Sequence, residues 1–159
     1  MSKIEVLGFA RAKYKNIVKN VATKVIKLTK QSDNLEVAVE FVSKSKIRKL
    51  NRENRGIDKV TDVLSFPSTQ IVAGELLNIK DPFVDCLKTD EENVHFGDIA
   101  LCFARCKKQA KEYGVTVESE IKKLIIHSML HLMGYDHIKD EDFKVMNKKE
   151  QELDKKIEI

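Results

Sequence analysis

The sequence is poor in cysteine, tryptophan and long apolar runs. It has three cysteines, no tryptophan and two prolines among 159 residues. An odd number of cysteines at no framework spacing does not suit the disulfide scaffold of a small secreted protein and is typical of a reducing compartment. No apolar run approaches the roughly 20 residues that cross a bilayer, and the first residues do not resemble a signal peptide. We therefore expect a cytoplasmic protein with no membrane partner.

Aromatic residues are also scarce, at 6% of the chain. No aromatic-rich platform for stacking single-stranded bases is visible, so we expect this chain to read little nucleic-acid sequence by itself. Repeats, low-complexity tracts and linkers are missing as well. With 42% apolar and 34% charged residues, the composition predicts one globular domain over residues 1–159, with a single continuous core.

Positive charge is concentrated in one segment. The net charge of the chain is only +4, but residues 44–59 carry a local charge of +5. A basic patch attracts phosphate backbones through Coulomb steering and counterion release. A solvated helix face has the same composition and, taken alone, is the more common explanation. The basic residues of the segment are Lys44, Lys46, Arg48, Lys49, Arg52, Arg55 and Lys59.

Apolar residues recur at helical and strand spacings along most of the chain. They predict helices over 14–26, 103–113, 117–133 and 141–156, and strands over 35–42, 63–66 and 99–102. A further helix is expected to begin after Ser43 or Ser45 and to end at Gly56. Residues 67–96 are hard to assign, and the pattern of 71–79 is compatible with an edge strand or a hairpin arm. This order predicts an α+β fold, a small mixed sheet covered by helices.

The second half of the 117–133 helix is apolar nearly all round, so this helix should be central and buried. It carries His127 and His131, four residues apart. At about 100° per residue the two side chains point within roughly 40° of each other, one turn apart, which lets both imidazoles converge on one ion. Gly134 can adopt the left-handed conformation that ends a helix, and the resulting turn can bring His137 back over the same ion.

Three neutral imidazoles make a catalytic rather than a structural zinc site, because the fourth position stays open for water or substrate. We therefore predict one zinc ion, held by His127, His131 and His137. Buried histidines at such spacing can instead be merely hydrogen-bonded, but here three of four histidines fall within eleven residues. The fourth, His95, is expected to have no role. A thiolate site at Cys102 and Cys106 is also conceivable, although small buried cysteines are usually packed as hydrophobes.

The spacing H-x-x-x-H-x-x-G-x-x-H equals that of the metzincin peptidases, so the helix is metzincin-like. Those enzymes carry a glutamate directly after the first histidine as general base, and here that position is Ser128. A serine does not accept a proton from metal-bound water at neutral pH as a carboxylate does, which argues against proteolysis. Asp136, beside the third histidine, can serve as such a base or, more in keeping with its position, orient a ligand imidazole.

The stretch His127-Ser128-Met129-Leu130-His131-Leu132-Met133-Gly134-Tyr135-Asp136-His137 closely resembles the signature of the YbeY family of ribosomal RNA maturation factors. Two further blocks, Leu50-Asn51 to Pro67 and Gly97-Asp98-Ile99, agree with that family in the same order. The C-terminal helix with Phe143 and Met146 also fits. The resemblance therefore spans most of the chain.

This resemblance implies a single-strand-specific, zinc-dependent endoribonuclease that matures the 3′ end of small-subunit ribosomal RNA and acts in ribosome quality control. Single-stranded RNA, ribosomal RNA and the small ribosomal subunit are then the expected partners. The resemblance places the zinc ligands at the three histidines and a functionally required arginine at Arg55. Two departures concern Ser128, where most members have glycine, and residues 67–96, which are longer than usual. The added hydroxyl can bond back to a helix carbonyl.

Two other functions remain compatible with the residues. One is a zinc metallopeptidase, favoured by the histidine spacing and weakened by Ser128. The other is a ribosome-assembly factor that is not catalytic and uses zinc only structurally. A fourth protein ligand to the metal would favour the assembly factor.

Overall fold

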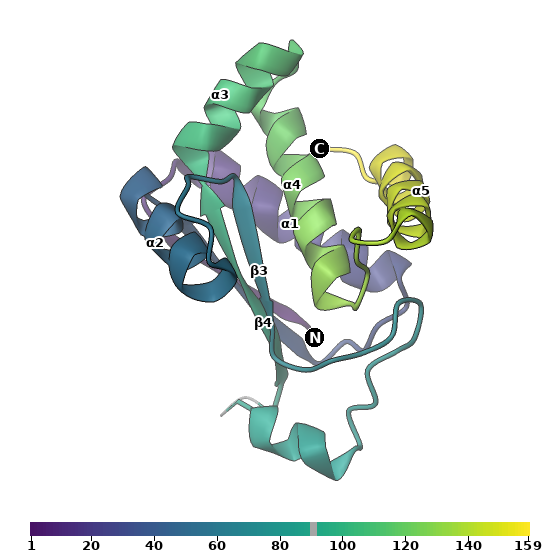
Figure 1. The fold of residues 1–159 in the computed structure, drawn as a ribbon. Coiled ribbons are helices and arrows are strands. Elements are labelled where there is room, and N and C mark those ends of the chain that lie inside the picture. The colour runs from purple at the N-terminus through teal and green to yellow at the C-terminus, as the bar shows by residue number, and fades with distance from the viewer. Residues whose placement is uncertain (90–91) are drawn as a thin grey trace.

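The computed structural model describes residues 1–89 and 92–159. Its central element is a four-stranded mixed sheet (Figure 1). The strand order is β1-β2-β4-β3. The strands are β1 (Lys3–Gly8), β2 (Leu35–Val42), β3 (Val63–Pro67) and β4 (Val94–Cys102). β1, β2 and β4 run parallel, whereas β3 pairs antiparallel with β4. The mixed sheet and the α+β class are as the sequence predicts.

Helices fill the connections between strands and the C-terminal third of the chain. They are α1 (Ala12–Leu28), α2 (Lys44–Arg55), α3 (Phe103–Tyr113), α4 (Val117–Leu132) and α5 (Asp140–Lys156), with a short 3-10 helix, η1 (Pro82–Leu87). Ser43 caps α2 by accepting the Lys46 N–H at 3.1 Å. Thr116 caps α4 in the same way, from the Ser119 N–H at 3.0 Å. No helix of the described residues has both the length and the hydropathy needed to span a membrane.

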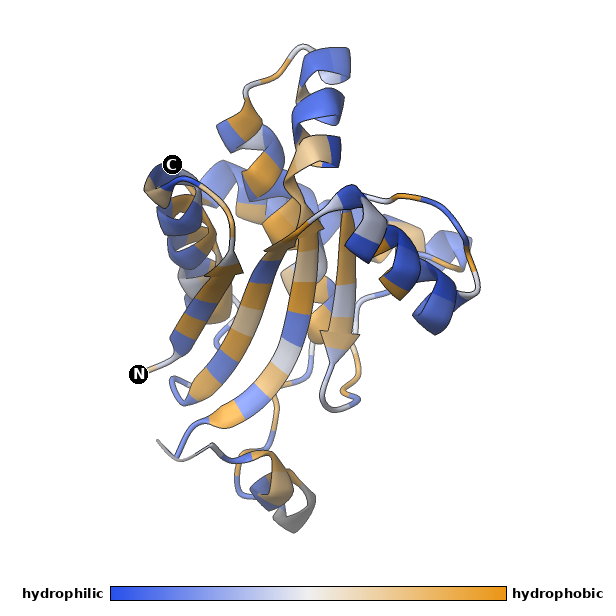
Figure 2. Ribbon diagram, turned by 90° about the vertical axis from the view of Figure 1, so that its left-hand side faces the viewer, coloured by the Kyte–Doolittle hydropathy of each residue, from blue (hydrophilic) through white to orange (hydrophobic). Residues whose placement is uncertain are grey.

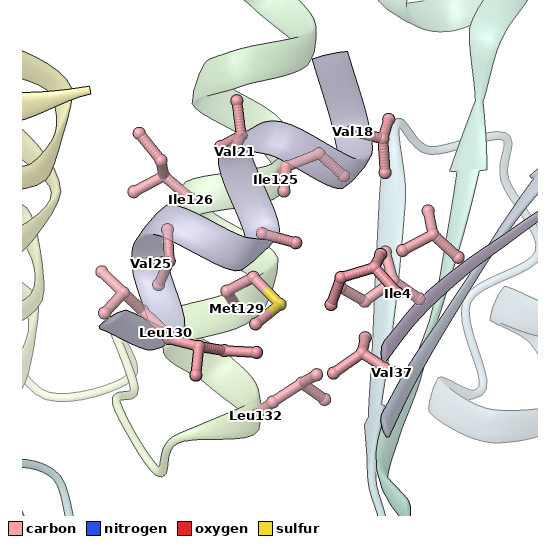
Figure 3. Packing of buried hydrophobic residues seen from close by; sticks show 14 of the residues in the cluster. Ile4, Val18, Val21, Val25, Val37, Ile125, Ile126, Met129, Leu130 and Leu132 are labelled. Atoms are coloured by element: carbon pink, nitrogen blue, oxygen red, sulfur yellow. The ribbon is translucent and has the colours of Figure 1, made fainter. Parts of the chain in front are cut away.

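The main core lies between the sheet and the pair of helices α1 and α4 (Figure 3). The alternation along β2 sends Leu35, Val37 and Val39 to this face, where each is fully buried. Burial of each large apolar side chain contributes about 1.5–3 kcal/mol, so α4 is held in place by many such contacts. The labelled side chains of α4 in this core are Ile125, Ile126, Met129, Leu130 and Leu132.

The opposite face of the sheet has a smaller core under α2. Ile47 is fully buried there against Leu64 and Cys102, and the basic residues of α2 are exposed. Figure 2 shows this helix as mostly hydrophilic. Gly56 ends α2 with a φ of 70°, in the left-handed conformation expected for this position. α2 therefore presents its C-terminal end beside the start of β3.

The structure differs from the sequence-based assignment in two places. The strand β1 is missing from that assignment, and residues 71–79, compatible with an edge strand or a hairpin arm, form no strand. Buried Gln31 accounts for the second difference, because its amide bonds to the backbone of that segment. Its Nε2 donates to the Glu75 carbonyl at 3.1 Å and its Oε1 accepts the Leu77 N–H at 3.0 Å. A side chain thus takes the backbone partners that a neighbouring strand would have supplied.

Candidate metal centre

The last two turns of α4 carry His127 and His131 at the edge of its buried face. Leu130 and Leu132 on the same turns are buried in the main core, while both imidazoles are half-buried. The apolar stripe therefore fixes the rotation of α4, and that rotation turns both histidines toward the same side. This is the arrangement predicted from their spacing.

A helix-ending turn brings the third histidine back to this pair. Gly134 has a φ of 90°, and its N–H donates to the His131 carbonyl at 3.1 Å. The Tyr135 N–H donates to the Leu130 carbonyl at 3.0 Å, which completes a Schellman motif. The chain reverses here, as predicted, and His137 follows at the surface.

The three imidazoles meet at one point. One nitrogen from each ring lies within 4.8 Å of the other two, and the Nε2 atoms of His127 and His131 are 3.1 Å apart. Tetrahedral zinc with bonds of about 2.0–2.1 Å requires nitrogens about 3.3–3.4 Å apart, so the His127–His131 pair is near that separation and the three imidazoles are a donor set that suits such an ion. Within the described residues, no other group of histidine, cysteine and acidic side chains gathers in this way.

The surroundings of His131 favour its neutral form, which has a lone pair free to bind a metal. Burial, followed by the charges of His127 and His137, lowers the pKa of His131 to about 4. A hydrogen bond with the backbone of Tyr135 and the charge of Asp136 act in the opposite direction on this pKa. His131 is therefore neutral at pH 7, which is the form that binds a metal.

A cleft of about 1200 Å³ opens in front of the histidines and has Arg55 on its wall. Arg55 is exposed in the last turn of α2, and the loop after it is held by Asn51, whose Nδ2 donates to the Lys59 carbonyl at 2.9 Å. Arg48 and Arg52 both bind Asp58, at 2.9 and 3.4 Å. Arg55, by contrast, forms no ion pair with any described residue. The structure therefore brings the predicted arginine and the three histidines to one cleft.

Other residues singled out in the sequence lie elsewhere or have different partners. His95 lies in β4 rather than in a loop, 3.0 Å from Asp98, and is not part of the cluster. Cys102 and Cys106 are buried, and burial raises the pKa of the Cys106 thiol to about 12, as for a packed hydrophobe. Asp136 accepts the His137 backbone N–H at 2.6 Å, and no imidazole is among its described hydrogen-bond partners.

Ser128 is fully buried, and its hydroxyl has no hydrogen-bond partner among the described residues. The bond back to a helix carbonyl that the sequence suggested does not form. A hydroxyl without access to the cleft also has no way to act on a substrate there. The residue that follows the first histidine is therefore not a replacement for the peptidase base.

Sequence reasoning missed the acidic partner of the first histidine. Glu150 of α5 lies with its Oε1 2.7 Å from the Nδ1 of His127. The signal was present in the spacing, because Glu150 falls four residues after Met146 and three before Leu153, on the apolar stripe of the last helix. An acidic residue in such a stripe indicates a specific partner on the facing element.

Comparisons with known proteins agree with the motif-based resemblance. A family model described as Endoribonuclease YbeY matches residues 2–158. A protein named Endoribonuclease YbeY from Clostridium acetobutylicum is 44% identical over 142 residues, covering 87% of this chain and 84% of the relative. A protein of the same name from a Thermoanaerobacter species is 41% identical over 146 residues, covering 90% and 87%.

A solved structure supports the fold. The solution structure of a protein from Thermotoga maritima superposes with a TM-score of 0.61 at 28% sequence identity. The match covers 96% of this chain and 87% of the other. The similarity in fold therefore extends over nearly the whole chain.

Proposed function

This chain belongs to the YbeY family of endoribonucleases, and from that premise we propose that it is a zinc-dependent endoribonuclease specific for single strands. Its proposed substrate is ribosomal RNA of the small subunit, matured at the 3′ end, with a further role in ribosome quality control. Such a substrate implies a cytoplasmic protein that contacts the small ribosomal subunit. The observation that carries the proposal is the convergence of three imidazoles and Arg55 on one cleft.

His127, His131 and His137 would hold the zinc ion. When bound, zinc supplies a Lewis acid for a phosphoryl oxygen, or a water of lowered pKa as nucleophile. The cluster has no fourth histidine, cysteine or acidic ligand among the described residues, which leaves a position for substrate. This favours a catalytic over a purely structural ion.

Arg55 is proposed to bind the phosphate that is cut. Its guanidinium forms a planar fork of donors that matches phosphate oxygens, and no carboxylate of the described residues competes for it. The rest of the α2 patch is partly neutralised, because Lys46 binds Glu40 at 2.8 Å while Arg48 binds Asp58. The basic residues of segment 44–59 therefore attract the RNA on either side of the cut phosphate more weakly than the sequence charge of +5 implies.

One experiment separates the proposed function from its two rivals. Purified protein is analysed for metal by mass spectrometry and incubated with single-stranded RNA, double-stranded RNA and casein, with and without a chelator. We expect one zinc per chain, cleavage of single-stranded RNA only, loss of cleavage with chelator and its return with added zinc. Cleavage of casein alone would support the peptidase, and bound zinc with no cleavage of any substrate would support the assembly factor.

A further inference from the structure

α5 packs alongside α4 through an apolar stripe next to which Glu150 lies (Figure 1). Met146, Leu153 and Ile157 of this stripe are each at most 1% exposed. Glu150 shares their spacing and therefore faces α4 as they do. A carboxylate on such an inward face is costly unless it finds a partner there.

The partner of Glu150 is His127. Oε1 of Glu150 lies 2.7 Å from Nδ1 of His127, and the two side chains are 23% and 32% exposed. An ionised carboxylate only accepts hydrogen bonds, so the contact places the proton of the imidazole on Nδ1. The lone pair is then on Nε2, the nitrogen that lies 3.1 Å from Nε2 of His131 in the cluster.

The neighbouring charged residues of α5 form ion pairs with other residues instead. Lys149 and Lys156 both bind Glu152, at 3.3 and 3.2 Å, and Asp154 binds Lys122 at 3.1 Å. The described ion pairs of Glu150 include only the one with His127. Glu150 thus takes no part in the other ion pairs of its helix and is directed at the histidine cluster.

We propose that Glu150 is a positioning residue of the metal centre. It holds the ring of His127 in the tautomer that presents Nε2 to the ion, and its negative charge makes that nitrogen a stronger donor. This inference rests on the proposed function, because it requires a metal at the three histidines. The same contact also joins α5 to α4. Looser packing of α5 against α4 would therefore displace His127.

Zinc affinity distinguishes positioning from a merely structural link between the helices. The variants are Glu150→Ala, Glu150→Gln and, as a matched control on the same helix, Glu152→Gln. Zinc dissociation constants are measured by competition with a chromogenic chelator, on protein whose folding is checked by circular dichroism. We expect Glu150→Ala to bind zinc 10–100-fold more weakly. Glu150→Gln, which keeps an acceptor without the charge, should fall between it and the wild type, and Glu152→Gln should match the wild type.

A second measurement determines the tautomer of His127 directly. It also tests the inference if Glu150→Ala fails to fold, because it uses the wild type and Glu150→Gln. Long-range ¹H–¹⁵N spectra of metal-free protein should show His127 protonated at Nδ1 in the wild type, with a mixture of tautomers in Glu150→Gln. Wild-type zinc affinity in a folded Glu150 variant, with an unchanged tautomer, would overturn the inference and leave the proposed function standing. A wild-type protein that binds no zinc would overturn both.

Discussion

The backbone of Ile71 lies directly against Gly134, at the turn between the second and third histidines. A Cβ at position 134 would collide with the carbonyl oxygen of Ile71, and the φ of 90° is one that L side chains rarely adopt. Ile71 and Val72 also line the cleft in front of the histidines. The segment after β3 therefore forms a wall of the site and requires glycine at the turn.

Replacing Gly134 with alanine should disrupt both this wall and the metal centre. Backbone strain and the collision with Ile71 should together cost at least about 2 kcal/mol of unfolding free energy, since the neighbouring atoms belong to backbone. Chemical denaturation measures this loss, and zinc titration should show weaker binding because His137 is displaced.

Gly114→Ala is the matched control. Gly114 also has a positive φ, 66°, but open space around its Cβ, so about 1 kcal/mol and unchanged zinc binding are expected. Equal losses in both variants would show that the contact with Ile71 is unimportant.

Arg55→Ala should separate catalysis from metal binding. We expect cleavage of single-stranded RNA to fall about 10²–10³-fold, the range for removal of one donor to the developing charge. Zinc content should stay at the wild-type level, because Arg55 touches no histidine in the described contacts. Arg52→Ala, on the same helix but bound to Asp58 and outside the cleft lining, should retain nearly full activity. Full activity in Arg55→Ala, measured by single-turnover cleavage, would remove Arg55 from the mechanism.

Local patterns were sufficient to predict most elements and the meeting of the three histidines. The apolar spacing of α4, the cap at Thr116 and the glycine at 134 each act within a few residues, so that they can be read from one stretch of sequence. Three histidines on one helix and its turn are likewise a local arrangement. The confirmed α+β class follows from the order of these local signals.

The errors concern contacts between distant parts of the chain. β1 becomes a strand by pairing with β2, about thirty residues away, and its own alternating pattern is short because the apolar Leu7 lies at an exposed position. The 71–79 segment is held by Gln31, which lies some forty residues earlier in the sequence. Glu150 meets His127 only because α5 packs beside α4. The partners of β1 and of the 71–79 segment leave little trace in a single sequence, and that of Glu150 leaves only an acidic residue within an apolar stripe.

The stability of the metal-free protein should depend on pH through His131. Its pKa is lowered from 6.5 to about 4 in the folded state, so the unfolded chain binds the proton first as the pH falls. The stability that the protein gains by keeping His131 neutral is complete above pH 6.5. As the pH falls, this stability is lost progressively down to about pH 4. The full shift corresponds to roughly 3 kcal/mol, which the partial exposure of the ring reduces to about 1–2 kcal/mol.

Urea denaturation at several pH values measures this dependence, with His131→Gln as the comparison. The variant has no titrating group at this position and should show a flatter profile between pH 6.5 and pH 4. Saturating zinc should shift the wild-type profile, because the ion binds only the deprotonated ring. Identical slopes in wild type and variant would mean that His131 is not protonated differently in the two states.

Ser128→Ala should stabilise the protein, although it alters a buried residue next to His127. The serine hydroxyl is fully buried without a described partner, and an unsatisfied buried polar group costs about 1–3 kcal/mol. Alanine removes this cost and is also the better helix former, by a few tenths of a kcal/mol. Ser119→Ala, at an exposed position of the same helix, isolates the propensity term. We expect thermal unfolding to show a gain of about 1 kcal/mol or more for Ser128→Ala over Ser119→Ala, with zinc affinity unchanged. A loss of stability in Ser128→Ala would instead indicate that a bound water satisfies the hydroxyl and ties α4 to β3, where Ser65 already donates to the Ser128 carbonyl at 3.4 Å.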